Sequence, residues 1–128
     1  IDIRRGEPVL ANVTGGLSGP AVRPVALRMV YQVAGAVSIP VIGMGGIAGV
    51  EDAIRFFMAG ASAIQVGTAA FARPSLLMEL VDGIPAWLAE HGHGQLADIV
   101  GTANPRFLAR REATPVADRG ITERDFAR

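Results

Sequence analysis

Two glycine-bearing turns are the features of this sequence best suited to chemistry, because each could bind an anion. Gly43-Met-Gly-Gly-Ile47 and Gly67-Thr68 each follow a short apolar run and precede a segment with helical spacing. Glycines at such positions let backbone N–H groups approach an anion closely, and the N-terminus of the following helix adds a favourable partial charge. Thr68 adds a hydroxyl donor. Glycines also suit simple tight turns, but two such turns at the same end of adjacent strands favour a phosphate site.

The first turn also matches part of a dinucleotide-binding pattern. Gly43-Met-Gly45-Gly-Ile-Ala48 has the spacing G-x-G-x-x-A. That fingerprint expects an acidic residue about 20 positions later, at the end of the next strand, to hold a ribose. The corresponding stretch, Ala63-Ile-Gln-Val-Gly-Thr68, contains no carboxylate. A Rossmann dinucleotide site is therefore not expected.

Other polar side chains have simpler explanations than catalysis or metal binding. His91 and His93 lie in a His-Gly-His-Gly stretch with no further ligands nearby, which is typical of exposed histidines at a helix end. Ser18 has no histidine at a spacing that would indicate a nucleophilic serine. Glu51 and Asp52 are expected in the first turn of a helix, where negative charge is favourable. The sequence therefore predicts no metal site and no catalytic side chain in this chain.

The glycine turns need strands before them and helices after them. Pro8-Val-Leu-Ala-Asn12 is predicted to be a short extended run that leads into the loop at 14–19. Apolar residues recur at helical spacing over residues 21–37, and Pro20, capped by Ser18 or Gly19, is suited to begin that helix. The short apolar run at 40–44 predicts a strand that is buried on both faces.

A second unit follows the same plan. Gly49 is suited to begin a helix that Gly60 ends, and residues 63–66 form the next predicted strand. A third helix is expected from about Pro74, with a kink or restart at Pro85. Strand, helix, strand and helix in this order predict an α/β fold with parallel strands and flanking helices, as in part of a (β/α)₈ TIM barrel.

Composition limits the classes of protein to which the chain can belong. Half of the 128 residues are apolar, and 12 basic residues, all of them Arg, balance 12 acidic ones. These values exclude a disordered chain and do not favour a nucleic-acid or membrane partner. The absence of Cys excludes disulfides and thiolate metal sites, and the absence of Lys excludes a Schiff base. No continuous apolar run is long enough to span a membrane, and we expect a cytoplasmic protein.

The chain is predicted to consist of one domain and a tail. Residues 1–112 form the α/β domain, and residues 113–128 form a flexible polar tail. After Asn104, Arg and acidic residues become frequent and the apolar periodicity fades. A short helix is expected within the tail, at 121–126.

Several motifs in a fixed order point to a known family. They are Thr14-Gly-Gly-Leu-Ser-Gly-Pro-Ala21, Arg23-Pro-Val-Ala-Leu-Arg-Met-Val30, Ile42-Gly-Met-Gly-Gly-Ile47, Gly60-Ala61 and Gln65-Val-Gly-Thr68. With these motifs the chain closely resembles the carboxyl-terminal part of dihydroorotate dehydrogenase, and the match is best to the cytosolic, NAD-linked class 1B catalytic subunit. The resemblance runs from Ile1 to about Leu108 with the spacings intact.

The resemblance implies an FMN-containing barrel that oxidises dihydroorotate to orotate in pyrimidine biosynthesis. It places Gly19 against the flavin, and Gly45, Gly46, Gly67 and Thr68 on the FMN phosphate. It also implies a homodimer and an electron-transfer subunit that carries FAD and an iron–sulfur cluster. Because this chain has no Cys, such a cluster would belong to another polypeptide.

Several functional residues of the family have no counterpart here. The family's catalytic base (a Cys or Ser), its flavin-contacting Lys and its orotate-binding asparagines all precede the position of Ile1. A complete barrel needs about 250 residues, so we expect this chain to be a fragment that is inactive alone. Two alternatives stay open: a related dihydropyrimidine dehydrogenase barrel, which shares the Gly-Gly-Leu-Ser-Gly and Gly-Gly-Ile elements, and a non-catalytic half-barrel that binds phosphate ligands.

Overall fold

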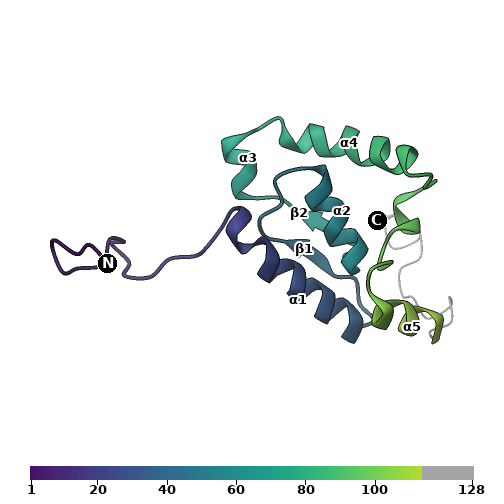
Figure 1. Ribbon diagram of the computed structural model, residues 1–128, viewed down its shortest axis with the longest axis horizontal. Coiled ribbons are helices and arrows are strands. Elements are labelled where there is room, and N and C mark those ends of the chain that lie inside the picture. Colours follow the sequence, from purple (N-terminus) through teal and green to yellow (C-terminus); the bar gives the residue numbers. More distant parts are fainter. Residues whose placement is uncertain (114–128) are drawn as a thin grey trace, which may run out of the picture.

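The computed structural model describes residues 1–113 and forms an α/β unit built around two parallel strands (Figure 1). The elements in chain order are η1 (Pro20–Val22), α1 (Arg23–Ala36), β1 (Ile42–Met44), α2 (Val50–Ala59), β2 (Ala63–Gln65), α3 (Thr68–Ala72), α4 (Leu76–Glu90), η2 (Leu96–Asp98) and α5 (Pro105–Ala113). Apart from Ala113, which ends α5, the tail predicted from residue 113 lies outside the described residues, as does the helix predicted at 121–126.

The two strands pair in parallel, and three helices pack side by side on one face of them. Gly43 lies opposite Ile64 in the register, and α2 lies between α1 and α4 (Figure 1). Gly43 faces α2, since a Cβ at this position would be 2.6 Å from Cδ1 of Phe56. The parallel βα arrangement that the sequence predicts is therefore confirmed.

The other face of the strands differs from the prediction. Ile42 and Met44 are 58% and 54% exposed, whereas burial on both faces was expected. In a (β/α)₈ barrel this inner face is filled by side chains from the other strands. Within residues 1–113 no element covers it, so the apolar side chains of β1 face outward.

Helix α2 begins and ends where the sequence predicts, and it carries much of the core. Gly49 is the N-cap residue, and Gly60 ends the helix in the left-handed conformation with φ of 113°. The buried side chains of α2 include Ile54, Phe56 and Phe57. They pack against residues of α1, α4 and the strands to form the single core cluster of the described chain.

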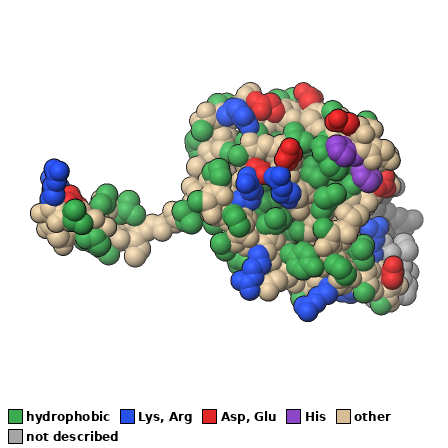
Figure 2. Space-filling view, in the orientation of Figure 1, with side chains coloured by type: hydrophobic (Ala, Val, Ile, Leu, Met, Phe, Trp, Pro, Cys, Tyr) green, Lys and Arg blue, Asp and Glu red, His purple; other side chains and the backbone are tan. Residues whose placement is uncertain are grey.

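One other local prediction was wrong. The run from Pro8 to Asn12, which the sequence predicts to be extended, forms a turn that ends at Val13 with φ of 64°. It belongs to an N-terminal arm, residues 1–16, that points away from the body and exposes its apolar side chains (Figures 1 and 2). The arm pairs only with itself, through a bridge between Asp2 and Glu7, because nothing else among residues 1–113 lies beside it.

The helix predicted from about Pro74 begins at Leu76 and does not restart at Pro85. Helix α4 continues through Pro85, and α3 forms as a separate short helix before it. Leu80 and Leu88, on either side of Pro85, are both buried in the core. Packing of this apolar stripe compensates for the hydrogen bond that proline removes, since tertiary contacts supply most helical stability in proteins.

Helix α5 follows Asn104, and the buried side chain of this residue anchors the helix to the rest of the fold. Its Nδ2 donates to the carbonyl oxygens of Tyr31 at 2.8 Å and Ala59 at 2.9 Å. Its Oδ1 accepts the N–H of Phe107 at 3.2 Å. One side chain therefore links α1, α2 and α5.

No helix within residues 1–113 is both long and apolar enough to span a membrane.

Candidate functional site

A cavity of about 530 Å³ lies at the carboxyl ends of both strands. All five residues that the sequence assigns to cofactor binding line it: Gly19, Gly45, Gly46, Gly67 and Thr68. Its volume falls within the usual range for small-molecule and cofactor sites. A second cavity, of about 440 Å³ between α1 and α5, contains none of these five residues. The structure thus brings the two predicted glycine turns together with the loop before α1.

The turn after β1 lies directly against the loop before α1. Gly45 and Gly46 have φ of 116° and 72°, conformations that residues with a Cβ rarely adopt. A Cβ at Gly46 would be 2.6 Å from the carbonyl oxygen of Gly19 and 2.7 Å from Cβ of Arg23. Gly46 is therefore needed for the close approach of two backbone segments, whatever the cavity binds.

The turn after β2 has no such constraint. A Cβ at Gly67 would meet no atom within 4 Å, and φ is −117°. Thr68, the first residue of α3, is exposed at the cavity. Packing within residues 1–113 therefore does not explain the glycine at 67, which leaves the approach of a ligand as a reason for it.

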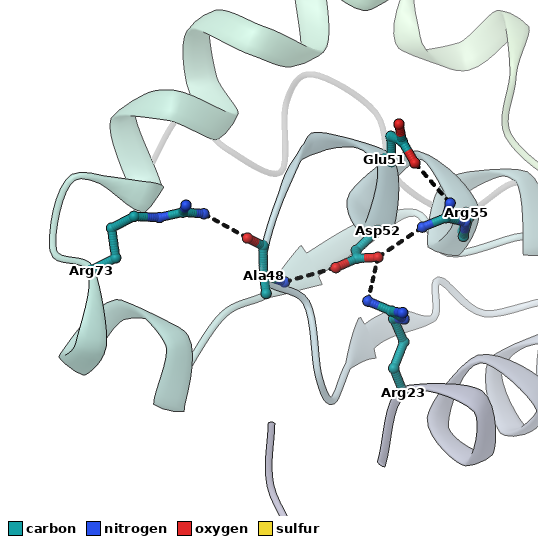
Figure 3. Close-up of polar contacts among 6 residues, drawn as sticks. All are labelled: Arg23, Ala48, Glu51, Asp52, Arg55 and Arg73. Atoms are coloured by element: carbon teal, nitrogen blue, oxygen red, sulfur yellow. Dashed lines mark hydrogen bonds and ion pairs between the residues drawn. The ribbon is translucent and has the colours of Figure 1, made fainter. Parts of the chain in front are cut away.

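Charged side chains bind both backbone polar groups of Ala48, the residue that follows the glycine turn after β1 (Figure 3). The Ala48 N–H donates to Oδ2 of the buried Asp52 at 3.1 Å, and the Ala48 carbonyl accepts a hydrogen bond from Nη2 of Arg73 at 2.6 Å. Asp52 is itself paired with Arg23 at 2.6 Å and with Arg55 at 2.8 Å. The sequence identified Asp52 only as a first-turn charge and missed both Arg23 and Arg73.

This arrangement changes the electrostatics expected from the sequence. The Asp52 carboxylate already occupies the N-terminus of α2, so the positive end of that helix is matched within the protein. Helix α3 has only five residues and adds little. An anion in the cavity would therefore depend on backbone N–H groups, the Thr68 hydroxyl and side-chain charge rather than on helix ends.

The histidines lie away from this cavity. His91 stacks on Trp87 with ring centroids 3.9 Å apart, and its Nδ1 is 2.8 Å from the Trp87 carbonyl oxygen. His93 also stacks on Trp87, at 6.0 Å. Residues 1–113 contain no cluster of three or more His, Asp or Glu side chains suited to a metal ion.

Parallel βα units with a cavity at the carboxyl ends of the strands are typical of α/β proteins that bind ligands at this edge of the sheet. A family model described as dihydroorotate dehydrogenase matches residues 1–88. The chain therefore belongs to the dihydroorotate dehydrogenase family, which confirms the resemblance carried by its motifs.

Similar proteins agree with this assignment. Relatives from Pelobacter propionicus and Trichlorobacter lovleyi are each 57% identical over 101 residues, and one from Bacteroides fragilis is 54% identical. All three are named dihydroorotate dehydrogenase B (NAD(+)), catalytic subunit. The matches cover 79% of this chain and 33% of each relative, so the chain spans about a third of their length. The crystal structure of the Eimeria tenella enzyme in complex with ferulenol superimposes with a TM-score of 0.63 at 30% identity, covering 70% of this chain and 24% of that one.

Proposed function

We propose that this chain is part of the catalytic subunit of an FMN-dependent dihydroorotate dehydrogenase, which oxidises dihydroorotate to orotate in pyrimidine biosynthesis. The observation that carries the proposal is that one cavity gathers Gly19, Gly45, Gly46, Gly67 and Thr68 in a chain that is 57% identical to such a subunit over 101 residues. The fold would be the carboxyl-terminal portion of a complete (β/α)₈ barrel.

The residues present fit the phosphate end of FMN. The two glycine turns line the cavity at the carboxyl ends of neighbouring strands, where glycine lets backbone N–H groups come close to an anion, and Thr68 adds a hydroxyl. We assign Gly45, Gly46, Gly67 and Thr68 to the phosphate and Gly19 to the flavin. When bound, the flavin supplies the chemistry of accepting the electrons that dihydroorotate loses.

The remaining functions would come from outside this chain. Arg73 is the only ionisable side chain that lines the cavity among residues 1–113, and it is not a base at neutral pH. The base and the orotate ligands would belong to the two-thirds of the relatives that the chain does not match. A homodimer and an electron-transfer subunit carrying FAD and an iron–sulfur cluster complete the proposal, which places the protein in the cytoplasm. The description "catalytic subunit" of the relatives supports a further subunit.

A chimera tests the proposed function. In it, this chain replaces the aligned third of the P. propionicus relative. We expect the chimera to purify with about one FMN per chain and to bleach that flavin when dihydroorotate is added without oxygen. The unaltered relative is the control. A folded chimera that retains no flavin, or flavin that dihydroorotate does not reduce, would contradict the proposal.

Alanine substitutions of two glycines test the site residues. In the chimera, Gly67→Ala is expected to weaken FMN binding about tenfold, because a Cβ there obstructs close approach of the backbone at a cost of about 1.4 kcal/mol. Gly49→Ala is the matched control, since Gly49 also has open space around its Cβ position but does not line the cavity.

A valine at position 46 should have a larger effect. Gly46→Val should weaken FMN binding further and also lower the melting temperature, because the valine side chain collides with Gly19 and Arg23. Equal FMN affinity in Gly67→Ala and Gly49→Ala would refute the assignment of Gly67.

A further inference from the structure

Arg73 is the one charged side chain that lines the cavity within residues 1–113. It lies in the connection between α3 and α4, and the chain contains no Lys that could take its place. The family motifs on which the site assignment rests do not include it. The assignment of the glycine turns to the FMN phosphate therefore leaves the role of Arg73 open.

The electrostatics of the site leave a need for positive charge. A phosphate monoester carries roughly −1.5 to −2 charges at neutral pH. The N-terminus of α2 is matched by Asp52, and Arg23 and Arg55 are paired with that carboxylate. Backbone N–H groups alone would leave much of the phosphate charge without a counter-charge in a partly enclosed cavity, where such interactions are stronger than in water.

The guanidinium of Arg73 lies beside the glycine turn after β1. Its Nη2 donates to the carbonyl of Ala48, two residues after Gly46, and its Nε is 3.4 Å from Oε2 of Glu79. Figure 3 shows the side chain reaching from its own loop to Ala48. Its Nη1 amino group has no acceptor among the residues that the structure describes. The ion pair with Glu79 joins side chains that are 51% and 46% exposed, unlike the pairs of the buried Asp52, so solvent weakens it and Arg73 can donate to a ligand as well.

We propose that Arg73 recognises the phosphate of the flavin and makes the site select FMN over riboflavin, which has the same ring and ribityl chain without the phosphate. This inference rests on the proposed function. The competing explanation is that Arg73 only braces Ala48 and so holds the turn in shape. If Arg73 only holds the turn in shape, it should strengthen the binding of both flavins equally. If Arg73 binds the phosphate, it should strengthen the binding of FMN alone.

Binding of the two flavins to the apo form of the chimera separates these explanations. Dissociation constants for FMN and riboflavin are measured by flavin fluorescence for the unmodified chimera and for Arg73→Gln. We expect Arg73→Gln to weaken FMN binding about tenfold, as for the loss of a charged hydrogen bond, and to change riboflavin binding less than about twofold. Arg73→Lys should recover part of the preference for FMN because it keeps the charge. Arg28→Gln, an exposed arginine on α1 that does not line the cavity, is the matched control.

The outcomes distinguish the inference from the proposed function. If Arg73→Gln weakens both flavins by the same factor, or neither, the phosphate role of Arg73 is wrong while the FMN site stands. If the unmodified chimera binds neither flavin, the proposed function itself fails. A selective loss of FMN affinity, rescued in part by Arg73→Lys, supports both.

Discussion

The 128-residue chain alone is expected to show no oxidation of dihydroorotate above background, even with FMN and an artificial electron acceptor added. Proton abstraction from the substrate needs a base within hydrogen-bond reach, and the cavity lining within residues 1–113 offers no Cys, Lys, His, Asp or Glu. We therefore expect no measurable turnover by the isolated chain. The assay follows reduction of the acceptor and formation of orotate.

Complementation is the control for this prediction. Co-expression with the two-thirds of the P. propionicus relative that this chain does not match should restore measurable turnover. That segment alone should be inactive, since it lacks the glycine turns assigned to the phosphate. Turnover by the 128-residue chain without the complementing segment would contradict the prediction.

The surface of the chain supports the same expectation. Ile42 and Met44 on β1 and the stripe of Val25, Met29 and Val33 on α1 are all exposed. Each strand of the two-stranded sheet also has one edge that pairs with no other strand among residues 1–113. Exposed apolar area and open strand edges promote association, so the isolated chain should dimerise, aggregate or stay loosely packed. Sedimentation velocity and binding of a hydrophobic dye would measure this, with the chimera as the compact reference.

Local sequence signals predicted the elements that depend on local chemistry. Gly49 and Gly60 marked both ends of α2, because an N-cap and a left-handed C-cap have residue preferences of their own. The glycine turns were placed correctly at the ends of β1 and β2 for the same reason. The carboxyl ends of parallel strands lie at the same edge of a sheet. The order of strands and helices along the chain was therefore enough to predict that the two turns lie together.

Long-range polar contacts were not predictable in this way. Asp52 pairs with Arg23 from another helix, and Arg73 reaches Ala48 across 25 positions of sequence. Neither pair has a characteristic spacing, because the fold and not the local chain brings the partners together. The exposed inner face of β1 was missed for a related reason. An apolar run predicts burial, but no element within residues 1–113 covers this face.

Asn104 is a fully buried polar side chain that the sequence analysis did not identify, and its substitution should have the largest effect on stability. Asn104→Asp in the chimera is expected to lower the free energy of unfolding by about 3 kcal/mol or more. The introduced carboxylate cannot donate to the carbonyl oxygens of Tyr31 and Ala59, which then face a buried negative charge instead of two N–H groups. Only the hydrogen bond from Phe107 N–H can survive the change.

Denaturant unfolding of the chimera, followed by circular dichroism, measures this loss. Asn12→Asp is the matched control, because Asn12 is exposed in the N-terminal arm and the same change of charge should cost almost nothing there. Since Asn104 links α5 to α1 and α2, protection of α5 amides from hydrogen exchange should fall more than protection of α4. Equal stability of the two variants would mean that the packing of Phe107 and Gly101 holds α5 in place without the Asn104 side chain.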